Sequence, residues 1–431
     1  MKLYSKSLLP KSLKTLPLLV GISLCLLCLH GCEKSERPTD WDAVTLVSPL
    51  HLTSQIGATV RLEVQLPKGM EATFVWSENK EPISTTNIAS LSLDKVGLRE
   101  FSLRVTDSKG EHRDWNMTVF AAKKHPYKVI AYYPSWRPSY VMRNWDKVSH
   151  ICCSFGEIGA DGSVDAAAVR SNMRQVIIDA HKNGVYALLS LGGGGGGAEF
   201  SQALLNEASR KKIADQALAL MESLKLDGLD VDFEHWDYAA SAENTRRCEA
   251  LEALLKDLRA RMPAGSLLSI ASASGYMRHN GYRASMTPYL DFISLMIYND
   301  SGNWASSAVG PHSGWNFYVE SVQRARSMGI PDAKIIPGIP FYGMRFPSAT
   351  NPVGATSITY SAIVDQYPGA EDKNAVTEAF IYYDGKPIVA QKSQYVVAQK
   401  LGGMMFWELT QDAGEASKSL LEVIHKELTG N

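Results

Sequence analysis

Two patterns of hydrophobic and polar positions divide this chain of 431 residues. From Trp41 to Ala122, apolar and polar residues alternate in short stretches separated by turn residues, as in Val60–Val64 and Phe101–Val105. Alternation with a period of two is typical of strands with one buried face, and closely spaced turns favour a small antiparallel sandwich. We therefore expect an all-β, immunoglobulin-like domain over residues 41–122. It is most simply a spacer, and a carbohydrate-binding module is the alternative.

After the segment Lys123–Pro126, continuously apolar strands alternate with amphipathic helices. Such strands are typical of parallel sheets covered on both faces. Eight units of this kind over about 300 residues predict an α/β fold, a (β/α)8 TIM barrel over residues 126–431. The predicted strands are Val129–Trp136, His150–Glu157, Tyr186–Gly192, Gly228–His235, Leu267–Ser274, Phe292–Asn299, Ile335–Phe341 and Gly403–Leu409, and the clearest helices are Val169–Asn183, Ser209–Leu224 and Thr245–Arg261.

Residues 1–31 have the features of a secretory signal. Four lysines precede the apolar run Leu16–Leu29, which is short for a membrane-spanning helix. The run ends in Leu29-His30-Gly31-Cys32, which is similar to the lipobox of bacterial lipoproteins and implies cleavage before Cys32 and lipidation of that cysteine. Glu33 rather than Asp follows, which by the same resemblance favours a lipid anchor in the outer membrane, on either face. Residues 32–40 are then a tether; a plain signal peptide or an uncleaved anchor is the alternative.

Charge and cysteine content narrow the function classes. The 44 Lys+Arg residues balance 45 Asp+Glu residues, so no basic excess exists to neutralise the phosphates of a nucleic acid. Beyond the signal, Cys152, Cys153 and Cys248 lack the spacing of metal ligands, and we interpret them as buried small apolar residues. We predict no metal site, and because nothing in the sequence indicates an oligomer, we expect a monomer.

The segment Asp227–Glu234 is the most informative stretch of the chain. With a period of two, Asp230, Asp232 and Glu234 share one face, and the apolar residues between them share the other. In a barrel the acids then point inward, in a row that rises by roughly 6.6 Å per two residues towards the C-terminal mouth, where barrel active sites lie. Three aligned acids cannot all ionise cheaply, so at least one should hold a proton near neutral pH, as a general acid requires. A divalent-cation site or a solvated strand edge is the alternative, and Asp227, of opposite parity, is interpreted as structural.

The D-G-x-D-x-D-x-E pattern of this strand resembles the signature of glycoside hydrolase family 18, the chitinases and related endo-β-N-acetylglucosaminidases. Four further segments resemble motifs of that family in the same order: Ser190–Gly193, Met296–Tyr298, Pro337–Gly343 and Gly402–Trp407. The resemblance implies retaining hydrolysis in which the substrate supplies the nucleophile. It implies that Glu234 protonates the leaving oxygen and later activates water.

The resemblance also implies roles for other residues. Asp232 would accept the N–H of the 2-acetamido group, Asp230 would share the proton of Asp232, and Tyr298 would donate to the acetamido oxygen. The expected substrate-binding residues are Trp407 as a stacking platform, together with Met296, Ser190, Asn299, Tyr133 and Phe155. Each of these supporting residues could instead be ordinary barrel packing. Asn299 stands where many chitinases have Asp, so we expect a lower pKa of Glu234 and a more acidic optimum.

We therefore expect a hydrolase of β-1,4-linked N-acetylglucosamine in chitin or its oligosaccharides, with no metal or organic cofactor. An endo-β-N-acetylglucosaminidase acting on the chitobiose core of N-glycans is one alternative, and a non-catalytic sugar-binding barrel is another. The short segment between Gly343 and Gly402 leaves little room for the α+β insertion that forms a wall in deep-cleft chitinases. The sequence thus predicts a shallow, open groove, but not the chain length of the substrate.

Overall fold

The computed structural model describes residues 40–277 and 279–430. The predicted signal peptide, Cys32 and all but the end of the predicted tether lie outside these residues. A 3-10 helix, η1 (Asp40–Ala43), belongs to a unit formed by residues 1–43, and residues 44–431 form a second compact unit. Within the described residues, no helix has the length and apolar character needed to cross a membrane.

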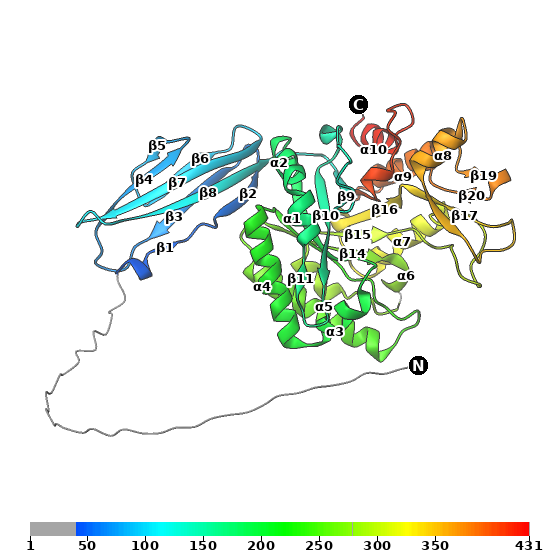
Figure 1. Cartoon of the computed structure of the whole chain (residues 1–431), viewed down its shortest axis with the longest axis horizontal. Coiled ribbons are helices and arrows are strands. Elements are labelled where there is room, and N and C mark those ends of the chain that lie inside the picture. The colour runs from blue at the N-terminus through cyan, green and yellow to red at the C-terminus, as the bar shows by residue number, and fades with distance from the viewer. Residues whose placement is uncertain (1–39, 278, 431) are drawn as a thin grey trace, which may run out of the picture. The chain divides into compact units, whose positions relative to one another are not determined.

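Two β-sheets occupy the first part of the second unit (Figure 1). A five-stranded sheet has the order β2-β8-β7-β4-β5 and a three-stranded sheet has the order β1-β3-β6. Buried and more exposed residues alternate along β3 and the second half of β7, where Leu62, Val64, Leu103 and Val105 are buried. This part of the chain is therefore built from strands, as the alternation predicted, and its immunoglobulin-like topology stays a prediction. The strands are β1 (Thr45–Leu46), β2 (His51–Gln55), β3 (Thr59–Gln65), β4 (Ala72–Glu78), β5 (Glu81–Ser84), β6 (Ile88–Ser92), β7 (Gly97–Asp107) and β8 (His112–Ala122).

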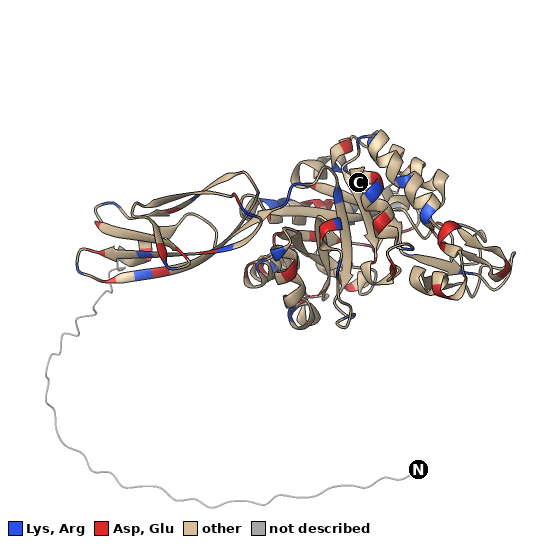
Figure 2. Ribbon diagram, turned by 90° about the horizontal axis from the view of Figure 1, so that it is seen from above, with Lys and Arg blue, Asp and Glu red and all other residues tan. Residues whose placement is uncertain are grey.

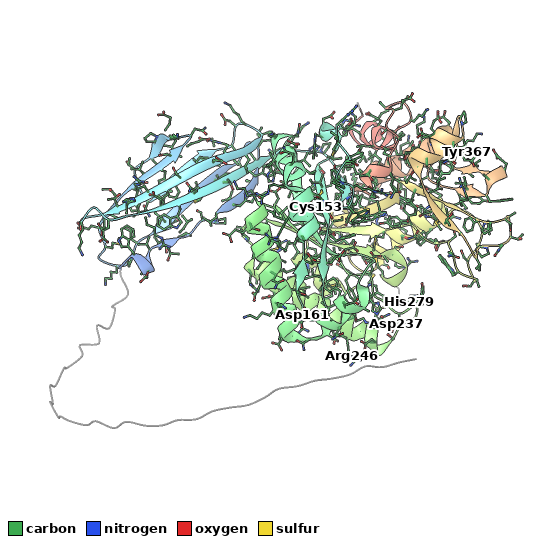
Figure 3. The ribbon with its side chains drawn as sticks, in the orientation of Figure 1. Cys153, Asp161, Asp237, Arg246, His279 and Tyr367 are labelled. Carbon is green, nitrogen blue, oxygen red and sulfur yellow. The ribbon has the colours of Figure 1, made fainter. Side chains whose placement is uncertain are left out.

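Eight parallel strands then close into a barrel in the order β9-β10-β12-β13-β14-β15-β16-β21, with β21 pairing back to β9. This confirms the predicted (β/α)8 fold. The strands are β9 (Lys128–Pro134), β10 (His150–Ile158), β12 (Tyr186–Gly192), β13 (Gly228–Asp232), β14 (Leu267–Ala273), β15 (Phe292–Met296), β16 (Ile335–Pro340) and β21 (Gly403–Trp407), and a short β11 (Val164–Asp165) pairs with β10. Cys152, Cys153 and Cys248 are free and buried, and on β10 Cys152 packs inside the barrel while Cys153 packs under the helices. Cys153 is labelled in Figure 3.

Helices surround the barrel and bury their apolar faces against the outer sides of the strands (Figure 1). The side chains of Asn206 and Ser241 cap α4 and α5 by accepting backbone N–H groups. The predicted helix Val169–Asn183 is two helices, which meet at Met173 (φ −104°, ψ −6°). The helices are α1 (Ala167–Asn172), α2 (Arg174–Lys182), α3 (Gly197–Leu205), α4 (Glu207–Leu224), α5 (Ala242–Arg261), α6 (Ser274–Met277), α7 (Trp315–Ser327), α9 (Lys386–Ala398) and α10 (Leu420–Thr429), with 3-10 helices η2 (Trp145–Lys147), η3 (Ala284–Tyr289), η4 (Asp332–Lys334), η5 (Ala370–Asp372), η6 (Thr377–Ala379) and η7 (Leu409–Gln411).

An α+β insertion follows β16, contrary to the sequence-based expectation. It contains a four-stranded antiparallel sheet of order β18-β17-β20-β19 and the helix α8 (Figure 1). The strands are β17 (Tyr342–Arg345), β18 (Thr356–Thr359), β19 (Ala375–Val376) and β20 (Ile381–Tyr382), and the helix is α8 (Tyr360–Gln366). Strands of two to four residues are too short to produce a clear alternation, and from the sequence only Phe380–Tyr383, which contains β20, looks like a strand. Tyr342 and Met344 of β17 line the pocket described below, so the expectation of a groove without this wall was wrong.

Charged residues of both signs are interspersed over the strands and helices (Figure 2). Close ion pairs join some of them, such as Arg99 with Glu78 and Arg326 with Asp332, each at 2.7 Å. The mixture agrees with the formal net charge of −1.

Candidate active site

Strand β13 carries the row of acids into the barrel. Asp230 and Asp232 lie on the strand and are buried, and Glu234 follows its end. The apolar residues that alternate with them pack in the outer core with the helices: Leu229, Val231 and Phe233. The period of two therefore places the acids inside the barrel, one above the other.

Asp230 is surrounded by hydroxyl donors. Its Oδ2 accepts hydrogen bonds from Tyr132 at 2.9 Å and Ser190 at 2.8 Å, and its Oδ1 accepts one from Ser269 at 2.6 Å. The strand register explains two of these contacts, because Ser190 of β12 and Ser269 of β14 are the direct neighbours of Asp230. Burial raises the pKa of Asp230, and the three donors act in the opposite direction because they stabilise its ionised form. Asp230 is the acid in this row that is best equipped to hold a negative charge.

Asp232 has a very different environment one layer higher. Its neighbours in register are Gly192 and Ala271, neither of which has a side-chain donor. Its Oδ1 is buried and has no hydrogen-bond partner within the part of the chain that the structure describes. Burial raises the pKa of Asp232 well above its ordinary value, and the negative charges of Glu234 and Asp230 raise it further. Asp232 therefore takes up a proton before Asp230 does, and its buried Oδ1 has no partner among the described residues.

Glu234 is the uppermost acid of the row. Burial raises its pKa to about 6. A carboxyl group with this pKa is part protonated in mildly acidic solution, so it can donate a proton and then accept one.

Two connected spaces lie at the C-terminal mouth of the barrel. The inner one, of about 210 Å³, contacts Asp232 and the outer one, of about 720 Å³, extends along α6 and the β15–α7 loop. Five residues line both spaces: Glu234, Met296, Tyr298, Asn299 and Tyr342. Glu234 thus borders both spaces.

Aromatic rings form the wall of the inner space. The Trp407 and Phe155 rings stack with centroids 5.6 Å apart and an interplanar angle of 14°, and Tyr132 lies 5.7 Å from Trp407. Trp136, which is 51% exposed, lies 6.0 Å from Phe155 and extends this surface outward. Flat apolar surfaces of this kind stack against the faces of sugar rings.

Tyr298 and its neighbours also line the inner space. Burial raises the pKa of Tyr298 well above its ordinary value, so its phenol keeps its proton and remains a donor. The Tyr342 hydroxyl donates to Asn299 Oδ1 at 2.7 Å, which leaves the Asn299 amide hydrogens as donors to the pocket. The structure therefore brings Tyr298 and Asn299 together with the acids.

The prediction for Tyr133 was wrong. Its ring packs in the outer core and its hydroxyl donates to the carbonyl of Tyr140 at 2.7 Å. The reason is parity: along β9, Tyr132 points into the barrel and Tyr133 points out. Tyr132, Ser269 and Tyr342 belong to the site but were not predicted from the sequence. The alternation of inward and outward side chains along β9 could have identified Tyr132. Ser269 can be identified only when the register between β13 and β14 is known.

The loop after Glu234 is fixed by one buried side chain. Asn244 Oδ1 accepts the N–H of Asp237 at 2.9 Å, and its Nδ2 donates to the carbonyls of Asp237, Ala239 and His279 at 3.0–3.1 Å. Asp237 and His279 are labelled in Figure 3. Tyr238, which is 86% exposed, and His279 form part of the lining of the outer space.

Asp227 forms a separate buried cluster before β13 begins. Its carboxylate accepts from His181 at 2.9 Å, from Thr53 at 2.8 Å, from the Ala187 N–H at 2.8 Å and from His51 at 3.3 Å. Burial would raise the pKa of Asp227, but His181 and His51 outweigh it and the pKa lies below its ordinary value. Among the described residues, only His51, His181 and Asp227 bring three potential metal ligands within 4.8 Å of one another. Four donors already satisfy this carboxylate, which fits the structural role predicted for Asp227.

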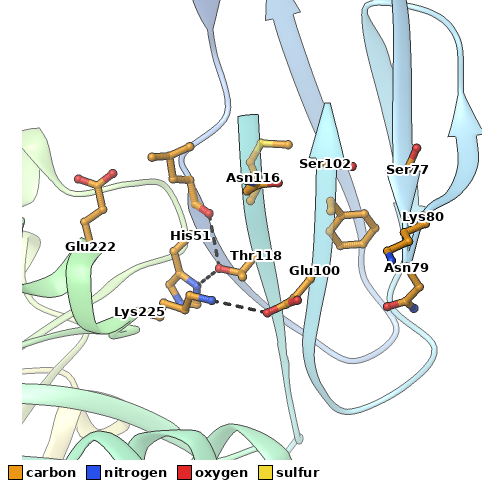
Figure 4. A pocket seen from close by; sticks show the side chains of 13 residues that line it. His51, Ser77, Asn79, Lys80, Glu100, Ser102, Asn116, Thr118, Glu222 and Lys225 are labelled. Atoms are coloured by element: carbon orange, nitrogen blue, oxygen red, sulfur yellow. Dashed lines mark hydrogen bonds and ion pairs between the residues drawn. The ribbon is translucent and has the colours of Figure 1, made fainter. Parts of the chain in front are cut away.

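A third space of about 790 Å³ lies beside β2, β7, β8 and α4 (Figure 4). His51 Nδ1 contacts the Thr118 hydroxyl there at 2.8 Å, and Lys225 pairs with Glu100 at 3.8 Å. The aromatic rings among its lining residues belong to His51 and Phe101, and both are buried. This space has no exposed ring for stacking and no row of acids, so the barrel mouth is the better candidate active site.

Comparisons with known proteins agree with this geometry. Chitinase 1 of Aphanocladium album is 25% identical over 340 residues, which is 65% of this chain and 79% of that protein. Chitinase B of Serratia marcescens is 25% identical over 371 residues, 62% of this chain and 73% of that protein. The crystal structure of a chitinase from Bacteroides thetaiotaomicron covers 70% of this chain and 96% of its own, with a TM-score of 0.62 and 26% identity. The family model of glycosyl hydrolases family 18 matches residues 128–412. The chain therefore belongs to glycoside hydrolase family 18 and is a chitinase-like hydrolase.

Proposed function

We propose that this enzyme cleaves β-1,4 linkages of N-acetylglucosamine in chitin or its oligosaccharides, with retention of configuration at the anomeric carbon. The observation that carries the proposal is the graded row of acids on β13. Asp230 is held by three donors, Asp232 has a buried oxygen without a partner among the described residues, and Glu234 has a pKa of about 6 and borders both spaces. The names of the related chitinases support the same substrate class.

In the proposed reaction, one sugar stacks on Trp407 in the inner space and the leaving sugar occupies the outer space. Glu234 protonates the glycosidic oxygen as the bond to the anomeric carbon breaks. The acetamido carbonyl oxygen attacks that carbon and forms an oxazolinium ion. Asp232 accepts the acetamido N–H, and Tyr298 donates to the acetamido oxygen. Glu234 then removes a proton from the water that reopens the ion.

The two acids below Glu234 have distinct tasks in this scheme. The acetamido N–H supplies the hydrogen bond that Asp232 Oδ1 lacks among the described residues. A negative charge on Asp232 stabilises the oxazolinium ion, and its proton can pass to Asp230. Asp230 stays in contact with three hydroxyl groups. Because a hydroxyl group can donate a hydrogen bond to the ionised carboxylate and accept one from the protonated acid, both protonation states of Asp230 keep hydrogen-bond partners.

Hydrolysis of chitotetraose, followed by NMR of the first product anomer, tests the proposal. We expect initial release of the β-anomer, and no cleavage of the corresponding tetramer of glucosamine, which lacks the acetamido nucleophile. Equal rates on both tetramers, or an α-anomer as the first product, would contradict the mechanism. A parallel incubation with a high-mannose glycopeptide separates chitin hydrolysis from action on the chitobiose core of N-glycans.

We also propose that the enzyme is held at the bacterial outer membrane by a lipid on Cys32. The support is the sequence alone: the basic segment, the short apolar run and the Leu29–Cys32 motif. A glycan polymer outside the cytoplasm is a fitting substrate for an anchored enzyme.

A further inference from the structure

His312 lies in the β15–α7 loop and is buried at 1% exposure beside the active-site wall. Its Nδ1 receives the backbone N–H of Asn299 at 3.3 Å, and its Nε2 contacts the carbonyl oxygen of Tyr342 at 3.2 Å. The Tyr342 hydroxyl in turn donates to Asn299 Oδ1 at 2.7 Å. These contacts form a closed ring of three residues from three segments: the end of β15, the loop and the start of the insertion.

The chemistry of the partners fixes the state of His312. A backbone N–H can only donate, so Nδ1 must be unprotonated, and a carbonyl oxygen can only accept, so Nε2 must carry the proton. His312 is therefore neutral, with one tautomer. Burial agrees with this assignment, since it lowers the pKa of His312 to about 4, although the hydrogen bond to the Tyr342 carbonyl acts in the opposite direction; the charge of Lys392 makes a smaller contribution that also lowers the pKa.

The segment that contains His312 holds the backbone on both sides of Tyr298. Ser313 donates to the carbonyl of Ile297 at 2.7 Å, and His312 accepts from the N–H of Asn299. Ser313 is itself held by the buried Lys392, which donates to its hydroxyl at 2.8 Å. Asn299 has a positive φ of 60°, a conformation that is uncommon for residues other than glycine and needs support from its surroundings.

We infer that His312 is a positioning residue for the proposed reaction, because it closes the hydrogen-bond ring that fixes the Tyr298–Asn299 turn against the acids. The inference rests on the proposed function. Through this turn, His312 determines where the Tyr298 hydroxyl and the Asn299 amide meet the acetamido group. A displacement of about 1 Å in a positioning group can cost about 100-fold in rate.

Three substitutions of His312 separate positioning from packing. His312→Ala removes both contacts, His312→Asn retains an oxygen near the Nδ1 position, and His312→Gln retains an amide donor near the Nε2 position. On chitotetraose we expect His312→Ala to lower kcat by about 10- to 100-fold, with KM changing less than about threefold because Trp407 still binds the sugar. We expect His312→Asn to recover more of kcat than His312→Gln, since it keeps the contact next to Tyr298. His150→Gln, at another buried histidine of the barrel, serves as the control and should lower thermal stability without lowering kcat.

Wild-type kcat in all three His312 variants, with only a loss of thermal stability, would overturn the inference while leaving the proposed function intact. If wild-type protein does not cleave chitotetraose, the proposed function fails. The hydrogen-bond ring of His312, Asn299 and Tyr342 can then still be tested by nitrogen-15 NMR of the full chain. A protonated Nε2, an unprotonated Nδ1 and slow exchange of the Asn299 amide support it. A protonated Nδ1 refutes it.

Discussion

Removing one hydroxyl donor from Asp230 should change the pH dependence of the enzyme. Ser269 makes the shortest of the three contacts, 2.6 Å, and it is the donor bound to Oδ1. A hydrogen bond to a charged group contributes about 1.5–3 kcal/mol, and one pKa unit corresponds to about 1.4 kcal/mol. Ser269→Ala should therefore raise the pKa of Asp230 by about 1–2 units, because the ionised form loses a donor and the protonated form loses little.

As a consequence, the loss of kcat at low pH, which we ascribe to protonation of Asp230, should begin at a pH that is higher by a similar amount. This part of the pH profile of kcat is called the acid limb below. The basic limb should stay in place, because it follows Glu234, whose pKa of about 6 depends on burial rather than on Ser269. The assay is the rate of chitotetraose cleavage between about pH 3 and 8. Ser272→Ala is the matched control, since Ser272 is buried on the same strand with the opposite parity. An acid limb that coincides in wild type, Ser269→Ala and Ser272→Ala would refute the reasoning.

Three further predictions rest on the structure and a fourth rests on the sequence. Glu234→Gln should lower kcat by about 100- to 10,000-fold. Folding raises the pKa of Glu234 from 4.5 to about 6, so ionisation of Glu234 destabilises the wild-type protein as the pH rises through this range. Glu234→Gln should therefore be more stable than wild type at pH 7, by up to about 2 kcal/mol. Thermal denaturation at pH 4 should show no such difference. Asn299→Asp adds a negative charge near Glu234 and should move the basic limb to higher pH; an unmoved limb contradicts this. Asp227→Asn should destabilise the fold by about 1–3 kcal/mol in urea titrations with kcat unchanged, since the Asp227 cluster lies outside the pocket. Cys32→Ser should move the protein from the membrane fraction to the soluble fraction, and retention in the membrane would argue for an uncleaved anchor.

The strands of the barrel could be predicted closely because their burial leaves a strong local signal. Tyr186–Gly192 was predicted with the bounds that the structure has, and β13 was predicted to start at Gly228, as it does. The inward row of acids followed from the same local rule, a period of two on one strand. What local patterns cannot supply is which residues of neighbouring strands lie at the same height. Ser269 is an ordinary serine in the sequence, and only the register of β14 against β13 places it on Asp230.

The α+β insertion and the hydrogen-bond ring of His312 were not predicted from the sequence, for a related reason. The strands of the insertion are too short to show a period, and their sheet is stabilised by pairing between segments far apart in the sequence, as between β17 and β20. His312 is separated from Asn299 by 13 residues and from Tyr342 by 30, and no spacing rule connects these three positions. A lone histidine in a loop gives no signal of its own until the fold supplies its partners.

The contrast between Asp230 and Asp232 shows how the register sets the chemistry of this site. Both are aspartates on one strand and both are buried, so burial alone cannot distinguish them. The layer of Asp230 contains two serines that donate to it, whereas the layer of Asp232 contains Gly192 and Ala271. Gly192 has φ of 103°, and a Cβ there would lie 2.4 Å from the Asp232 carbonyl oxygen, so no hydroxyl-bearing side chain could occupy this position without a shift of the backbone. The protein thus satisfies the lower acid and leaves the upper one without a donor at the height where the acetamido group of the substrate is proposed to bind. On this reasoning the hydrogen bond from the acetamido N–H to Asp232 Oδ1 forms only when substrate is bound. The unsatisfied buried oxygen then lowers the stability of the free protein and contributes its binding energy to catalysis.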